Sequence, residues 1–106
     1  YLHGHSVGGT NPSLLEALAC GNWVLAHDNP FNREVARTSA AYFSSPEELA
    51  AGIEQCVNAT AAERLARSQQ ARCIVQEYYT WEDIANAYET LMHAQCGAQS
   101  AGRRAA

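Results

Sequence analysis

The apolar positions of this chain fall into short continuous runs separated by segments with helical spacing. Trp23–Ala26 is apolar at every position, which is typical of a strand in a parallel sheet covered on both faces. Tyr1–His3 resembles the end of another strand, and Ala41–Phe43 a third short one. Strands that alternate with helices predict an α/β fold with a partial doubly wound, Rossmann-like parallel sheet and flanking helices. Since such sheets usually have about five or six strands, we expect the chain to be a piece of a larger domain.

The segment between the first two strands is predicted to be a helix with clear signals at both ends. Asn11 is a favoured N-cap residue, and Pro12 suits the first helical position, where its missing N–H costs nothing. Gly21 suits the position just after the C-terminal end of the helix. Glu16 lies well away from the apolar stripe, which is made of Leu14, Leu15 and Leu18. The stripe is therefore expected to pack on the sheet while Glu16 faces outward.

Four further helices are predicted, each opened by a capping residue. They are a short one from Asn29-Pro30 through Val35, one from Ser45-Pro46 to about Val57, one from Thr60 to about Tyr78, and a last one from Thr80. The last helix carries apolar residues on one face, namely Trp81, Ile84, Ala85, Tyr88, Leu91 and Met92. From Ala94 onward small and polar residues dominate, so residues 94–106 are expected to form a disordered tail behind a domain of residues 1–93.

A glycine-rich loop leads directly into the N-terminus of the first helix. Free backbone N–H groups and the positive end of the helix dipole make such a junction an anion site, most often for phosphate. The expected donors are the N–H groups of Gly9, Thr10, Asn11 and Ser13, with the hydroxyls of Thr10 and Ser13 assisting. The alternative is that Gly8-Gly9 forms only a tight turn.

Composition narrows the class of protein. The 106 residues carry a formal net charge of −4 and contain no run of lysine and arginine, which argues against a nucleic-acid partner. No apolar stretch approaches the roughly 20 residues needed to span a bilayer, and we find no signal peptide. The four cysteines are widely spaced without a C-x-x-C pair, which favours reduced thiols of a cytoplasmic protein.

Two other chemistries have partial support in the sequence. Gly4–Gly8 matches G-x-S-x-G, the nucleophile elbow of α/β-hydrolases, with Ser6 as nucleophile, Asp28 or Asp83 as the acid and His93 as the base. That elbow requires a helix that begins at the serine, which would place Pro12 inside the second turn at a cost of about 3 kcal/mol. His3 and His5 suggest a metal, but no third ligand lies nearby in the sequence.

The run Gly8–Ala26, with Asp28-Asn29-Pro30 and Arg33-Glu34-Val35 after it, resembles the donor-binding segment of family 4 glycosyltransferases. Trp81-Glu82-Asp83 with Tyr88 is similar to the closing helix of that family, so the resemblance covers roughly residues 1–92. His3–Glu16 is similar to a bacterial branch that includes rhamnosyltransferases of surface-polysaccharide assembly. The resemblance implies a retaining enzyme of the GT-B fold, of which this chain is the C-terminal part.

The resemblance also implies roles for single residues. The family motif has two glutamates separated by seven residues, and the second matches Glu16, which would bind ribose hydroxyls. The first falls on Gly8, so no carboxylate can contact the donor sugar from that position, and His5 and Ser6 are candidates for that contact. The family also favours proline where this chain has Trp23, a change expected to affect packing.

The implied reaction transfers a sugar from a nucleotide-diphosphate donor to a glycan or lipid-linked acceptor, without a metal or other cofactor. The helix dipole and amides would stabilise the charge that grows on the departing diphosphate. An N-terminal domain outside these 106 residues would hold the acceptor at the inner face of the membrane, so the fragment alone is expected to be inactive. A non-catalytic docking module, using the apolar face of the last helix, is the alternative from another class.

Overall fold

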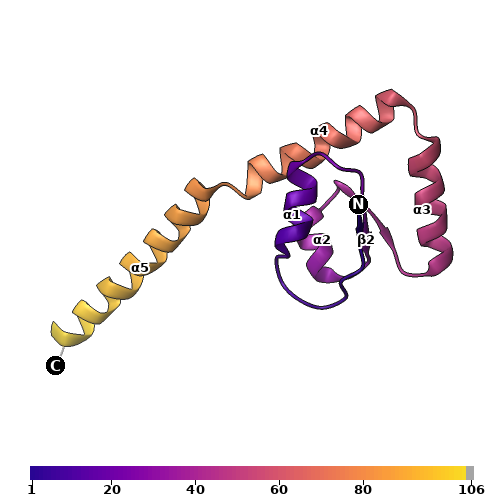
Figure 1. Ribbon diagram of the computed structural model, residues 1–106. Coiled ribbons are helices and arrows are strands. Elements are labelled where there is room, and N and C mark those ends of the chain that lie inside the picture. The colour runs from indigo at the N-terminus through magenta and orange to yellow at the C-terminus, as the bar shows by residue number, and fades with distance from the viewer. Residues whose placement is uncertain (105–106) are drawn as a thin grey trace.

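In the described part of the chain, three parallel strands form a sheet. Figure 1 shows the sheet between flanking helices. The computed structural model describes the backbone of residues 1–104 and the side chains of residues 1–96. The strands are β1 (Leu2–His3), β2 (Val24–His27) and β3 (Ala40–Phe43), in the order β1-β2-β3. Leu2 pairs with Leu25, and Ala26 pairs with Tyr42. This confirms the predicted α/β fold with a partial Rossmann-like sheet.

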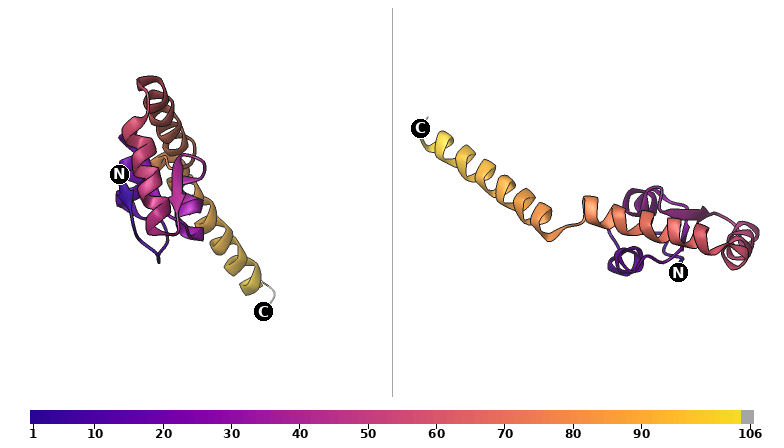
Figure 2. Two further views of the ribbon diagram at one scale, coloured as in Figure 1. Left: turned by 90° about the vertical axis from the view of Figure 1, so that its right-hand side faces the viewer. Right: turned by 90° about the horizontal axis from the view of Figure 1, so that it is seen from above.

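Among the described residues, five helices follow or separate the strands, and they begin close to the predicted positions. They are α1 (Pro12–Ala19), α2 (Pro30–Ala36), α3 (Pro46–Asn58), α4 (Ala61–Tyr78) and α5 (Trp81–Arg104). In Figure 1 α1 and α2 lie on one side of the sheet and α3 on the other, while α4 runs across one end of the body; Figure 2 shows the same arrangement from two further sides.

The side chains of β2 explain why its apolar run is continuous. Val24 and Ala26 point to one face, where they join a buried cluster with Leu14 and Leu18 of α1, Val35 of α2 and Ala71 of α4. Leu25 points to the other face, and an added Cβ on Gly52 of α3 would lie 3.1 Å from its side chain. Both faces are therefore covered, as the run predicts for a parallel strand.

The two ends of α1 form as the sequence predicts. Oδ1 of Asn11 accepts a hydrogen bond from the Ser13 N–H at 3.1 Å, which caps the helix start. At the other end Gly21, with φ of +74°, donates to the Leu18 carbonyl at 2.9 Å, and Asn22 donates to the Ala17 carbonyl at 3.0 Å. These two bonds define a Schellman motif, which requires a residue that tolerates positive φ.

The last helix extends away from the body of the molecule (Figures 1 and 2). Its backbone is helical to Arg104, and the expected disorder of residues 94–106 stays a prediction. The side chains of residues 97–106 lie outside the described residues, and the boundary after residue 93 stays a prediction. No helix in the described part of the chain combines the length and the apolar character needed to cross a membrane.

Candidate functional site

The loop between β1 and α1 encloses a small pocket at the end of the sheet where β1 and β2 finish. The pocket has a volume of about 180 Å³ and combines the loop with residues at the start of α2. Its walls are formed by His3, His5, Val7, Gly8, Gly9, Thr10, Asn11, Pro12, Asn29, Phe31 and Asn32. Ligands of open α/β sheets bind at this edge, outside the carboxyl ends of the strands.

Several hydrogen-bond donors at the N-terminus of α1 are free. Among the described residues, the backbone N–H groups of Gly9, Thr10 and Asn11 have no acceptor. The donors of Ser13 are already used, since its N–H and its hydroxyl both bond to Oδ1 of Asn11, at 3.1 Å and 2.7 Å. Its hydroxyl oxygen also accepts from the Tyr1 hydroxyl at 3.0 Å. For Ser13 to bind phosphate as predicted, its N–H or its hydroxyl would have to release Oδ1 of Asn11 and donate to the phosphate instead.

Two asparagines at the start of α2 hold the loop in place. Nδ2 of Asn29 and Nδ2 of Asn32 each donate to the His5 carbonyl at 3.0 Å. Asn32 also donates to the His27 carbonyl at 2.9 Å, and its side chain is only 4% exposed. Oδ1 of Asn29 caps α2 through the Asn32 N–H at 2.9 Å, as expected for an N-cap residue. The loop after β1 is thus fastened to the end of β2.

His3 is a second buried polar side chain of the pocket, beside Asn32. It is 1% exposed, and neither of its ring nitrogens has a hydrogen-bond partner among the described residues. Its ring stacks on that of His5, with centroids 4.7 Å apart. Burial, and after it the neighbouring His5, lower the pKa of His3, and the adjacent Asn32 side chain raises it by less. The net pKa therefore lies below its ordinary value, and the imidazole is neutral at neutral pH.

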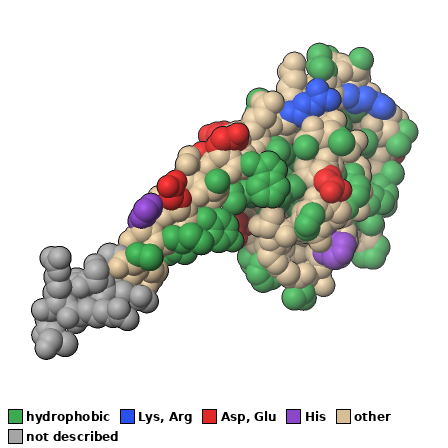
Figure 3. Space-filling model, turned by 60° about the vertical axis from the view of Figure 1, so that its left-hand side comes forward, with side chains coloured by type: hydrophobic (Ala, Val, Ile, Leu, Met, Phe, Trp, Pro, Cys, Tyr) green, Lys and Arg blue, Asp and Glu red, His purple; other side chains and the backbone are tan. Residues whose placement is uncertain are grey.

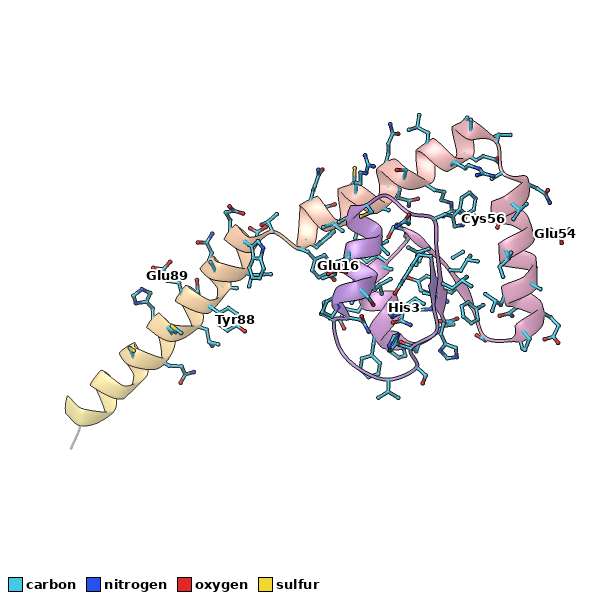
Figure 4. The ribbon with its side chains drawn as sticks, viewed as in Figure 1. His3, Glu16, Glu54, Cys56, Tyr88 and Glu89 are labelled. Carbon is cyan, nitrogen blue, oxygen red and sulfur yellow. The ribbon has the colours of Figure 1, made fainter. Side chains whose placement is uncertain are left out.

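Glu16 lies on the wall of a second and larger hollow of about 790 Å³ (Figure 4). Its side chain is exposed on α1, away from the buried Leu14 and Leu18, as the helical pattern predicts. Thr10 and Pro12 line both hollows, so the two adjoin at the N-terminus of α1. The far wall of the larger hollow is mainly apolar and comprises Val75, Tyr78, Tyr79, Trp81 and Ile84.

The residues of the hydrolase alternative are not assembled into a triad. Ser6 is exposed in the loop, and the helix begins at Pro12 rather than at the serine. His93 is exposed on α5, where Nε2 lies 3.7 Å from Oε1 of Glu89. The Asp28 carboxylate is bound by the Arg33 guanidinium, with Nη2 and Oδ2 2.7 Å apart, and this bond lowers the pKa of Asp28. The geometry therefore provides no acid–base–nucleophile relay.

The described residues also contain no group of three or more histidine, cysteine, aspartate or glutamate side chains arranged to hold a metal ion. The four cysteines are free thiols in the same part of the chain.

The apolar face of α5 is exposed to solvent. Trp81 is 83% exposed, and Tyr88, Leu91 and Met92 are each more than half exposed. Figure 3 shows hydrophobic side chains along this side of α5, continuing toward the body. The predicted stripe is thus present and has no partner among the described residues.

A parallel α/β sheet with a glycine-rich loop and a helix N-terminus at its carboxyl edge is an arrangement that many α/β proteins use to bind phosphate groups. The profile of the family described as glycosyl transferase-like matches residues 2–90. The chain therefore belongs to this glycosyl transferase-like family, and the predicted glycosyltransferase identity is confirmed at that level. Comparisons with curated proteins and with solved structures gave no match.

The sequence pattern predicts the loop and the exposed position of Glu16 on α1, but it does not single out Asn32 or His3 as residues of the pocket. Asn32 was not recognised because its bonds reach carbonyls of other segments, one of them 27 residues earlier. In the sequence His3 suggests only a metal ligand. Its position at the end of a strand, next to the glycine-rich loop, was the signal that could have placed it in the pocket.

Proposed function

We propose that this chain is the donor-binding part of a retaining, family 4 glycosyltransferase of the GT-B fold. The observation that carries the proposal is the set of unpaired N–H groups at Gly9, Thr10 and Asn11, which line a pocket at the N-terminus of α1. In the proposal they bind the diphosphate of a nucleotide-diphosphate sugar, with Gly8 and Ser13 at the two ends of the loop. Helix dipole and amides together favour an anion there.

Glu16 is proposed to bind the ribose hydroxyls of the same donor. It lies in the hollow that adjoins the loop pocket through Thr10 and Pro12, so one elongated ligand can reach both hollows. A carboxylate accepts hydrogen bonds from two neighbouring hydroxyls, as acidic residues do in other nucleotide sites. The sugar would then lie near His5 and Ser6, on the other side of the phosphate.

In the proposed reaction the loop stabilises the leaving group. As the bond between the sugar and the diphosphate breaks, negative charge grows on the diphosphate, and preorganised N–H donors bind that charge more strongly than they bind the ground state. The acceptor is a glycan or lipid-linked sugar of surface-polysaccharide synthesis, and rhamnose is the proposed donor sugar. A further domain holds the acceptor at the cytoplasmic side of the membrane, so we expect no turnover by these 106 residues alone.

The proposal is tested by NMR titration of the ¹⁵N-labelled chain with UDP, dTDP and inorganic pyrophosphate. The amides of Gly9, Thr10 and Asn11 should shift with all three ligands, and those around Glu16 only with the nucleotides. A preference for dTDP would favour a rhamnosyl donor. The absence of loop shifts at millimolar concentrations of all three ligands would refute a phosphate site.

Two matched variants separate the ribose contact from general effects of charge. Glu16→Gln should weaken UDP binding by about tenfold, the worth of hydrogen bonds to a charged group, and leave pyrophosphate binding unchanged. Glu54→Gln removes an exposed carboxylate on the opposite side of the molecule (Figure 4) and should change neither. Equal UDP affinities of Glu16→Gln and Glu54→Gln would contradict the proposed role. That result would favour the alternative of a docking module, in which Glu16 has no role.

A further inference from the structure

The buried imidazole of His3 lacks a hydrogen-bond partner within the described part of the chain. It is 1% exposed, and both Nδ1 and Nε2 are unpaired there. Buried polar atoms are nearly always hydrogen-bonded, so an exception indicates a partner from outside the chain, either water or a ligand. His3 lines the pocket at the N-terminus of α1, and a partner would reach it through that pocket.

The orientation of the ring is set by its surroundings. His3 stacks on His5 with a centroid distance of 4.7 Å and an interplanar angle of 27°. The backbone of His5 is in turn held by Nδ2 of Asn29 and Nδ2 of Asn32, each 3.0 Å from its carbonyl oxygen. The imidazole is therefore preorganised within the pocket, and a ligand that binds it does not have to order it first.

The pocket suits an anion that accepts hydrogen bonds. A neutral imidazole carries one N–H donor, and this donor adds to the free N–H groups of Gly9, Thr10 and Asn11 in the same pocket. No carboxylate is among the lining residues that the structure describes, so no side chain there repels negative charge. The volume of about 180 Å³ is far above what one water needs, roughly 10–15 Å³, and leaves room for a phosphoryl group.

We infer that His3 is a ligand-binding residue whose ring N–H donates a hydrogen bond to a phosphoryl oxygen held at the N-terminus of α1. The inference rests on the proposed function, because it adds a contact to the same diphosphate. His5 acts as a positioning residue, since its ring stacks on that of His3. The histidine thus supplies a side-chain donor in a loop where the family's first glutamate is replaced by Gly8.

The test follows the ring nitrogens of the wild-type chain by long-range ¹H–¹⁵N NMR during titration with inorganic pyrophosphate and, separately, with UDP. His3 nitrogens should shift with both ligands, while those of the exposed His93 on α5 stay unchanged as an internal control. Shifts of the Gly9–Asn11 amides without a shift of the His3 ring would overturn the inference and leave the proposed function standing. A loop that responds to neither ligand would overturn both.

A pair of variants gives a second readout. His3→Phe keeps a flat ring but removes both nitrogens, and it should weaken pyrophosphate binding by about tenfold, as expected for one hydrogen bond to a charged group. His93→Phe should leave the affinity unchanged. Folding of His3→Phe is checked by its amide spectrum. If His3→Phe is unfolded, the ring shifts of the wild-type chain decide the question. If the variant is folded and binds pyrophosphate as tightly as the wild type, the hydrogen-bond partner of His3 is water and not phosphate.

Discussion

Replacing Asn32 by alanine tests whether the loop pocket depends on one buried side chain. Nδ2 of Asn32 donates to the His5 carbonyl at 3.0 Å and to the His27 carbonyl at 2.9 Å. Its side chain therefore connects the loop after β1 to the end of β2 from the first turn of α2. Asn32→Ala removes both bonds and leaves the N–H bond to Asn29 in place.

The expected cost follows from these two bonds and from the burial of the side chain. A typical hydrogen bond contributes about 0.5–1.5 kcal/mol net, so losing two costs about 1–3 kcal/mol. The His5 carbonyl keeps its bond from Asn29, which limits the penalty for an unpaired acceptor. We therefore expect Asn32→Ala to lower the free energy of unfolding by about 2 kcal/mol, a large share of the roughly 5–15 kcal/mol of an ordinary domain.

The change is measured by urea denaturation followed by circular dichroism, with the amide shifts of residues 5–11 as a second readout. Asn86→Ala is the matched control, because Asn86 is exposed on α5 and its substitution should alter stability by no more than about 0.5 kcal/mol. Equal unfolding free energies of the two variants, together with unchanged loop amides, would refute the anchoring role of Asn32.

The positive-φ glycines and the buried histidine have measurable consequences as well. Gly8 has φ of +130°, whereas Gly4 does not have a positive φ and does not line the pocket. Gly8→Ala should therefore weaken UDP binding by about tenfold, and the matched Gly4→Ala should leave Kd within about twofold in the same NMR titration. Gly21 has φ of +74°, and a Cβ there would collide with the Ser68 hydroxyl. Gly21→Ala should therefore cost about 1–2 kcal/mol in urea denaturation, and an unchanged midpoint would contradict the strain. Burial lowers the pKa of His3 from its ordinary 6.5, so the unfolded chain takes up the proton more readily than the folded one. The stability that His3 contributes is present above about pH 6.5 and is lost as the pH falls through the lower pKa of the folded state. His3→Phe should therefore reduce the dependence of the unfolding free energy on pH below about 6.5. If the wild type and the variant show the same dependence, groups other than His3 cause the loss of stability.

Local signals in the sequence were sufficient for the elements that carry the site. Asn11, Pro12 and Gly21 predicted both ends of α1, because capping depends on residues within one turn of the helix end. The apolar run at residues 23–26 predicted a buried strand, and the strand lies at Val24–His27. Element type and position could be predicted here since each depends on neighbours in the sequence.

Contacts between distant segments could not be predicted in the same way. The two acceptors of Asn32 lie on loops that meet only once the sheet has formed. The Arg67 guanidinium of α4 lies 5.2 Å from the centre of the Trp23 ring, a packing contact between distant segments. The helix pattern also did not reveal that the hydroxyl of Ser13 bonds to Asn11, because a free and a bonded serine give the same sequence.

The conformation of Gly8 bears on the way this chain departs from the two-glutamate motif of the family 4 glycosyltransferases that it resembles. At φ of +130° an L side chain is strained, although the space around Gly8 is open. A glutamate at this position would therefore favour another loop conformation, so the missing carboxylate and the observed loop are coupled. Among the described residues, the N–H groups of Gly9, Thr10 and Asn11 in this loop have no acceptor, and the loop lies beside a buried neutral histidine. Such a pocket would bind an anion through N–H dipoles rather than through a charged side chain. Donors of this kind need little reorganisation as charge develops on a leaving diphosphate, which is the property that the proposed transfer requires.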